Sequence, residues 1–259
     1  MHAVKGLSGR ELEPDLLSGT PALVAGQQYA GPMTLTDDDK DAVLRSVDAL
    51  LGNPDQWIEP SGYRQSLALA SIDSVFSLRT RYSSVVSVLN RYRDARRRAG
   101  ADPDSDGARE LLETITAAGG VEGAAQTLFT KNLSPGTRIL KVESLVRGVT
   151  ALQEVGVETA QDLREKAEAP EVRRAWLRQL GLGKASWDYL LMNVGIDGSK
   201  ADTMLIRFVA NALSTDGRLT PERAQEAVHA AADSLGVSCK ILDHTIWRYQ
   251  SRAATSRAR

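Results

Sequence analysis

The chain has 259 residues, of which 42% are hydrophobic, and its formal net charge is -1. This length and composition allow a sizeable buried core and predict one large domain or two helical lobes. The near-zero charge excludes a protein coated in basic surface. The single cysteine, Cys239, excludes an internal disulfide framework and a four-cysteine zinc or iron–sulfur site supplied by this chain.

Neither a membrane-spanning segment nor a leader is expected. No run approaches the roughly 20 apolar residues that span a bilayer, and residues 1–5 lack the apolar stretch of a signal peptide. We therefore expect a cytoplasmic protein with no membrane partner.

The N-terminal part divides into an arm and a first helix. Residues 1–34 are rich in Gly, Pro, Ser and Ala, which predicts a loosely ordered arm. Thr36, followed by three aspartates, predicts a helix start, because a hydroxyl cap and first-turn acids suit the free amides there. Apolar residues at helical spacing over 43–51 give this helix one buried face.

The next third of the chain is predicted to be helical up to a break. Residues 99–107, Ala-Gly-Ala-Asp-Pro-Asp-Ser-Asp-Gly, are dense in turn formers and indicate a linker or exposed loop. We place the boundary between two lobes either there or at residues 120–137. The arginine-rich run 91–98 is either a local basic face or the solvated end of a helix.

Further helices follow from residue 138 onwards. Gly156 ends one of them, Thr159 with Asp162 indicates a capping box, and Thr220 before a proline starts a later helix. The last helix is expected to end before a fraying basic tail, residues 251–259. Since no segment alternates with period two over strand length, the predicted fold class is all-α.

The run with the most chemical content lies within residues 171–213. Leu180-Gly181-Leu182-Gly183 joins two predicted helices through a hairpin, where backbone amides and the helix dipole favour a phosphate oxygen. Glycine lets a nucleic-acid backbone come close. Asp202 begins the next helix. Taken singly, the glycines are typical of a tight turn and Asp202 is typical of an N-cap.

Together these residues resemble the helix-hairpin-helix DNA glycosylase superfamily, the endonuclease III-like fold. Its pattern is Leu-Pro-Gly-x-Gly and, further along, Val-Asp-Thr-His-x-x-Arg. Residues 180–183 match the hairpin, and Asp202, Thr203 and Arg207 match the acidic signature. The resemblance covers roughly residues 63–249, with only 181–207 specific, and implies an all-α, two-lobe, glycosylase-like fold over residues 35–250.

The resemblance implies base excision from double-stranded DNA. A damaged or modified nucleotide would be rotated out of the duplex and its N-glycosidic bond cut. Asp202 would be the catalytic carboxylate, stabilising the positive charge on the sugar or activating the attacking water. The hairpin contacts to DNA would come from Gly181, Leu182, Gly183, Lys184 and Ser186.

Departures from the family pattern bear on the reaction. Bifunctional members carry a lysine nucleophile two residues after the second glycine, and here that position is Ala185, which predicts a monofunctional enzyme. Counting back from Asp202 instead puts Lys184 near the lysine position, so Lys184 is catalytic only in a bifunctional enzyme. Otherwise it is a phosphate contact or a solvated side chain. The hairpin proline is absent, and Met204 replaces the histidine.

Other residues carry two readings each. Arg79 and Arg81 fall where the family inserts side chains into the duplex, or they are surface arginines. Trp187 and Tyr189 would line a base pocket by stacking, or they belong to the core.

The histidines give no metal site. Asp243 and His244, with Trp247, resemble a family-type closing helix in which the Asp–His pair forms a structural hydrogen bond. His229 has no obvious partner for metal binding. The resemblance implies no cofactor and no metal cluster, because the cysteines of the family's iron–sulfur centre are missing.

The sequence thus predicts a monomeric, monofunctional DNA glycosylase, associated with the nucleoid in the cytoplasm. A second hypothesis is a non-catalytic helix-hairpin-helix DNA-binding or repair-accessory protein, which the near-neutral charge and the missing proline favour. A third is a protein-interaction domain in which the hairpin is only a turn.

Overall fold

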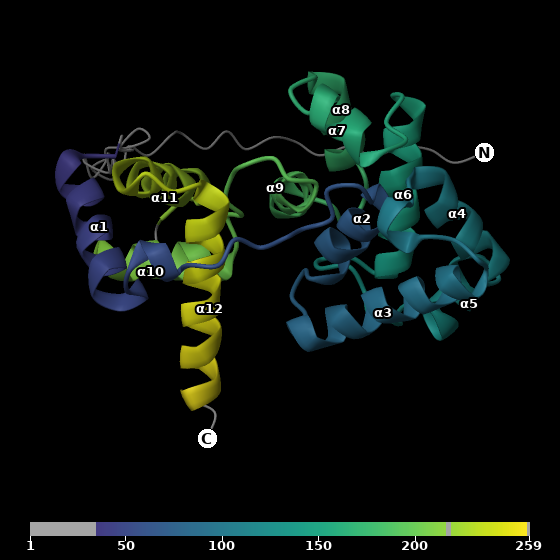
Figure 1. Cartoon of the computed structure of the whole chain (residues 1–259), viewed down its shortest axis with the longest axis horizontal. Helices are drawn as coiled ribbons and strands as arrows, with labels where there is room; N and C mark the ends of the chain where they lie inside the picture. Colours follow the sequence, from purple (N-terminus) through teal and green to yellow (C-terminus); the bar gives the residue numbers. More distant parts are fainter. Residues whose placement is uncertain (1–34, 216–218, 258–259) are drawn as a thin grey trace, which may run out of the picture. The chain divides into compact units, whose positions relative to one another are not determined.

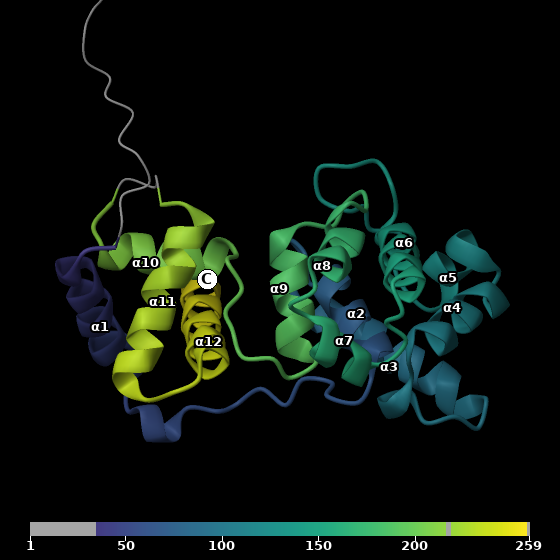
Figure 2. The same ribbon diagram turned by 90° about the horizontal axis from the view of Figure 1, so that it is seen from above.

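The computed structural model of the chain describes residues 35–215 and 219–257, and the predicted N-terminal arm lies outside them. Over these ranges the chain is all-helical, as predicted, and contains no strand (Figures 1 and 2). An isolated antiparallel bridge pairs Leu133 with Leu140 in the loop before α6.

Twelve α-helices and two short 3-10 helices make up the described part of the chain. They are α1 (Asp37–Leu51), η1 (Pro54–Gln56), α2 (Leu67–Phe76), α3 (Tyr82–Arg98), η2 (Pro103–Ser105), α4 (Ala108–Ala117), α5 (Gly120–Thr127), α6 (Lys141–Glu154), α7 (Ala160–Lys166), α8 (Pro170–Leu177), α9 (Lys184–Asn193), α10 (Thr203–Ala212), α11 (Pro221–Leu235) and α12 (Cys239–Arg257).

The predicted helix starts are confirmed where a local cap defines them. Thr36 and Asp39 form a capping box at α1, and Thr159 and Asp162 form another at α7. Thr220 caps α11, with a proline in the first turn. These signals act over three residues of sequence, so no distant contact is needed to read them.

The last helix does not end before residue 251, where its end was predicted. α12 continues to Arg257. The sequence Ser-Arg-Ala-Ala-Thr-Ser-Arg contains no glycine or proline, so nothing in it ends the helix.

The described helices pack around two hydrophobic cores. The larger core is built by α2 to α9 and contains Phe76, Tyr92 and Trp176. The smaller core joins α1 to α10, α11 and α12, and includes Val43 and Phe208. Figures 1 and 2 show α1 beside the C-terminal helices, so the two ends of the described chain share one core.

The chain crosses between the cores near residues 58–62 and 197–204, not at either predicted boundary. Residues 99–107 are part of the larger core's framework, because Asp106 is buried and bonds Tyr92 and Arg96. Residues 120–137 contain α5, which packs on α4 and α6. The composition of residues 99–107 correctly predicted a turn, but this turn does not separate the two cores.

None of the described helices combines the length and apolar character needed to cross a membrane.

Candidate functional site

The turn between α8 and α9 is fixed by a pair of serines. Gly181 has a φ of +85°, and a Cβ added there would lie 2.5 Å from the Cβ of Ser134. The Ser144 hydroxyl donates to the Leu180 carbonyl at 2.8 Å and lies 2.6 Å from the Ser134 hydroxyl. Gly181 therefore faces the 130–140 loop, which explains the glycine by close packing and left-handed backbone.

The start of α9 is held by Ser186. Its hydroxyl accepts from the Gly183 amide at 3.1 Å and from the Trp176 indole at 3.0 Å, and donates to the Gly183 carbonyl at 2.7 Å. The side chains of Ser186 and Leu182 are buried, so a DNA contact at these two positions would have to come from the backbone. Both were predicted from the hairpin alone, which does not show which side chains turn inward.

Two backbone amides remain open at this helix start. The amides of Lys184 and Ala185 lie in the first turn and donate to no acceptor among the described residues. Gly183 has a φ of -147°, and an added Cβ would meet nothing within 4 Å. The positive end of α9 is thus accessible to an anion next to Gly183.

Lys184 does not point freely into solvent. Its ammonium lies 2.8 Å from Oδ2 of Asp188 and also donates to Oε1 of Gln225 on α11. The Gln225 amide donates to the same Asp188 oxygen at 2.9 Å and to the Ser199 carbonyl at 2.5 Å. This polar bridge links α9 to α11, and therefore links the larger core to the smaller one.

Asp202 is the N-cap of α10, as one of its two readings predicted. Its Oδ1 accepts from the amides of Met204 and Leu205 at 2.8 and 3.1 Å. Its Oδ2 lies 3.5 Å from the Lys200 ammonium, and the side chain is 27% exposed. The carboxylate is therefore fixed in direction and still open to solvent on one side.

A buried carboxyl group with three tyrosines, the Asp73 cluster, lies close to Lys200. Asp73 on α2 accepts at Oδ2 from the hydroxyls of Tyr63 and Tyr82, at 2.9 and 3.3 Å. Tyr189 on α9 is the third tyrosine, and the Lys200 ammonium lies 4.1 Å from its ring centroid. Lys200 thus connects the Asp73 cluster to Asp202.

Burial sets the protonation behaviour of this cluster. It raises the pKa of Asp73 to about 6, against which the tyrosine hydrogen bonds and Lys200 act. Burial also raises the pKa values of Tyr63 and Tyr189, and that of Tyr82 to about 12, so these phenols are donors at neutral pH. The cluster is a set of O–H donors around one acid.

Sequence reasoning missed Asp73, Tyr63 and Lys200. A signal was present for Asp73, since it is the one acid inside the apolar helix sequence Leu-Ala-Leu-Ala-Ser-Ile-Asp-Ser-Val-Phe. Of the two predicted pocket aromatics, Tyr189 belongs to the Asp73 cluster. Trp187 is 3% exposed within the larger core, which is the second of the two roles predicted for it.

Asp243 and His244 do not form the expected pair. Oδ1 of Asp243 accepts from the Lys200 backbone amide at 3.0 Å, and burial raises its pKa to about 7. His244 stacks instead on Trp247, with ring centroids 5.7 Å apart. Trp247 contacts the Tyr82 ring at 5.5 Å, which brings α12 against α3.

His229 contacts a serine on the segment before α10. Its Nε2 lies 3.1 Å from the Ser199 hydroxyl. No three His, Cys, Asp or Glu side chains of the described residues come together as a metal site.

Arg79 and Arg81 lie exposed on the loop between α2 and α3. Arg79 has a φ of +50°, a strained backbone for this residue type. The buried Lys141 ammonium stabilises this loop through three hydrogen bonds. It donates to the carbonyls of Phe76 and Leu78 at 2.9 and 2.5 Å and to the Thr80 hydroxyl at 2.6 Å.

The arginine run on α3 forms no continuous basic face. Arg91 bonds the carbonyls at the end of α5, Arg93 bonds Asp104, and Arg96 bonds the buried Asp106. Arg97 and Arg98 flank only a shallow depression beside Asp94. Most of these cations therefore stabilise the fold.

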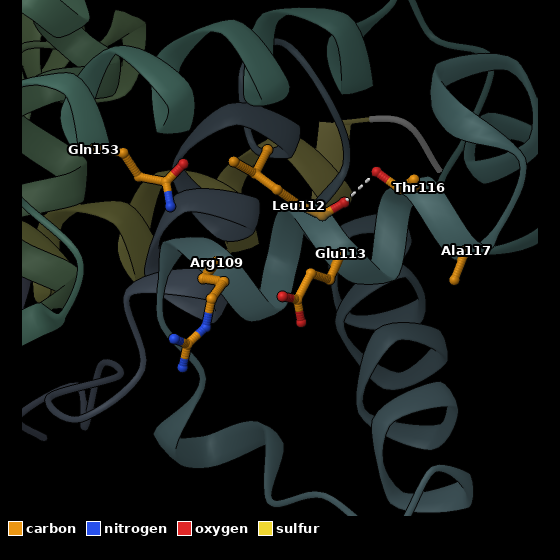
Figure 3. A pocket seen from close by; sticks show the side chains of 6 residues that line it. All are labelled: Arg109, Leu112, Glu113, Thr116, Ala117 and Gln153. Atoms are coloured by element: carbon orange, nitrogen blue, oxygen red, sulfur yellow. Dashed lines mark hydrogen bonds between the residues drawn. The ribbon is translucent and has the colours of Figure 1, made fainter.

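A second shallow depression, of about 420 Å³, lies on α4 (Figure 3). It is lined by Arg109, Leu112, Glu113, Thr116, Ala117 and Gln153. The Thr116 hydroxyl bonds the Leu112 carbonyl within the helix, and Arg109 pairs with the neighbouring Glu110. None of the predicted site residues lines it, and three of its polar side chains, those of Arg109, Thr116 and Gln153, already have partners in the fold.

Residues 41–251 match the family described as a domain of unknown function (DUF8548), and the chain therefore belongs to that family. No curated protein matches the chain. No solved structure matches it either.

Proposed function

We propose that this DUF8548 protein is a helix-hairpin-helix DNA glycosylase that hydrolyses the N-glycosidic bond of a damaged or modified base. Asp202 is its catalytic carboxylate. The observation that carries the proposal is the setting of Asp202, whose carboxylate is fixed by two backbone amides, 27% exposed, and next to a polar cluster between the two cores.

The geometry suits the charge that develops in this reaction. Breaking the bond between sugar and base leaves an oxocarbenium-like sugar. A carboxylate already oriented by two amides stabilises that cation without having to reorganise. Oδ2, which neither amide uses, is the oxygen that would face the sugar or the attacking water.

The start of α9 supplies a contact for the DNA backbone. The open amides of Lys184 and Ala185 and the empty space at Gly183 suit a phosphate oxygen. Leu133 and Leu180 are about half exposed on the two loops that meet beside it. Such a contact positions the duplex without reading its sequence.

A non-catalytic DNA-binding protein is the second candidate. The Lys200 ammonium 3.5 Å from Asp202 and the capping bonds explain this carboxylate by structure alone. In that case the α9 contact would be retained and no bond would be cut.

Base release decides between the candidates. Free base is measured from a panel of duplexes with damaged, mispaired or modified bases, for the wild type and for Asp202→Asn. Asparagine caps helices as well as aspartate does, so the variant keeps the fold. Release by the wild type that is lost in the variant supports the glycosylase. Equal release by both contradicts the role of Asp202.

A parallel gel-shift titration over several salt concentrations tests DNA binding. Contacts to phosphates give an affinity that falls steeply with salt. Salt-dependent binding with no base release identifies the second candidate, and absence of binding excludes both.

A further inference from the structure

Asp73 is a buried carboxyl group on a fully buried helix. All ten residues of α2 are buried, and Asp73 itself is 1% exposed. Burying a carboxyl group is unfavourable unless its oxygens are hydrogen-bonded. One of its two oxygens is satisfied: Oδ2 accepts from Tyr63 and Tyr82.

The other oxygen has no partner. Oδ1 of Asp73 is buried and makes no hydrogen bond to any described residue. An unsatisfied buried oxygen costs stability, and native folds rarely keep one without a use. The open oxygen lies in the same cluster as Lys200, which in turn faces Asp202.

The side chains that act on the Asp73 carboxyl group are three tyrosines and a lysine. They come from four segments: Tyr63 before α2, Tyr82 on α3, Tyr189 on α9, and Lys200 before α10. Tyr82 is 38% exposed and makes the longer of the two hydrogen bonds, so it is the ring that a ligand would displace. Three aromatic rings beside a carboxyl group suit a flat heterocycle.

We propose that Asp73 is the second acid of the reaction, binding the excised base through Oδ1 and protonating it as it leaves. This rests on the proposed function. The bond between C1′ and the base breaks with both electrons going to the base, and the Asp73 proton adds to a ring nitrogen of that base. Water forms the new bond to C1′ and gives a proton to Asp202, and solvent exchange returns each carboxyl group to its starting state.

The environments of the two acids fit this division of roles. Asp73 is buried among phenols, and burial raises its pKa to about 6, so a protonated fraction is present below neutral pH. Asp202 accepts two amide bonds and faces an ammonium. One group is suited to give a proton and the other to receive one.

Protonation by Asp73 would favour one class of base. An uncharged purine leaves poorly unless a ring nitrogen is protonated, and it offers acceptor nitrogens away from the bond that breaks. A purine alkylated to a cation already carries the positive charge and needs no acid. We therefore expect uncharged purines, such as hypoxanthine or adenine in a mispair, as substrates that depend on Asp73.

The test compares single-turnover release of uncharged purines with release of 7-methylguanine. Asp73→Asn should slow the first by about 100-fold or more, the usual contribution of a positioned acid, and the second by less than about threefold. Asp73→Glu should restore part of the rate. Wild-type release of uncharged purines should fall as the pH rises through about 6, and this dependence should vanish in Asp73→Asn.

Asp106→Asn is the matched control, because Asp106 is another buried aspartate that accepts from a tyrosine. It should destabilise the fold without changing the ratio of the two rates. Release by the wild type with an unchanged ratio in Asp73→Asn, or release of cationic purines or pyrimidines alone, overturns the role of Asp73 and leaves the glycosylase standing. No release of any base overturns both.

Discussion

The ammonium of Lys200 lies 3.5 Å from Oδ2 of Asp202, two residues further along the chain. The backbone amide of the same lysine donates to Asp243 on α12. The segment that leads into α10 is thus held by α12, and it presents Lys200 and Asp202 side by side. Two substitutions of Asp202 can separate its role as the cap of α10 from its proposed role in base release.

Asp202→Ala should lower the free energy of unfolding by about 1 kcal/mol, because the amides of Met204 and Leu205 lose their acceptor. Asp202→Asn should change the free energy of unfolding by only about 0.3 kcal/mol, because asparagine and aspartate cap helices about equally well. Both should lose base release. Urea unfolding followed by circular dichroism gives the stabilities. Thr220→Ala removes a cap from the same core and should cost a similar amount while base release stays intact; loss of release there would point to a stability effect.

The sequence correctly predicted those features that depend on residues close together in the chain. The caps at Thr36 and Thr159 and the N-cap at Asp202 each join residues two or three apart. The apolar spacing gave the all-α class for the same reason. The boundary at 99–107 failed because the partners of Asp106 lie on α3, outside the turn whose composition was read.

The candidate site needed contacts that no local pattern contains. Asp73 meets Tyr189 from a helix more than a hundred residues away, and Lys141 holds a carbonyl 65 residues before it. Trp187 and Tyr189 are two residues apart on α9 and therefore face different directions, one into the larger core and one into the Asp73 cluster. Which of them is buried depends on the register of α9 against α2.

Lys141→Met should destabilise the protein by about 1–3 kcal/mol at pH 7, because buried carbonyls lose their donor. Burial lowers the pKa of Lys141 from 10.5 to about 8. Between these values the unfolded chain holds a proton that the folded chain has released, so wild-type stability gains from rising pH there. Below pH 8 both states hold the proton and the gain is absent.

The measurement is urea unfolding of wild type and variant from pH 7 to 10. The stability difference in favour of the wild type should grow with pH above about 8. Lys131→Met, at an exposed lysine, serves as the control and should leave the wild-type pH profile unchanged. A constant difference between wild type and Lys141→Met would show that the buried amine does not titrate in this window.

Lys184 should not act as a nucleophile. Its ammonium is engaged by Asp188 and Gln225. Counted from the second hairpin glycine, Ala185 stands where bifunctional members of the resembled glycosylase superfamily carry their lysine. Borohydride treatment during base release should therefore trap no covalent protein–DNA adduct. Lys184→Gln should keep base release and lower the unfolding free energy by about 1 kcal/mol, because the partly buried ion pair with Asp188 is lost. An adduct that forms with the wild type and disappears in Lys184→Gln would establish a bifunctional enzyme.

Substitutions of the two hairpin glycines should have different effects. Gly181→Ser places a side chain 2.5 Å from the Cβ of Ser134 on left-handed backbone, so it should cost about 1–3 kcal/mol of stability. Gly183→Ser enters open space on extended backbone at an N-cap position that favours serine, so the fold should keep its stability. If a DNA phosphate occupies that space, Gly183→Ser should weaken binding about tenfold, or ~1.4 kcal/mol. Urea unfolding and gel-shift titration on one duplex separate the two effects. DNA binding by Gly183→Ser that equals the wild type would place the DNA contact elsewhere on the protein.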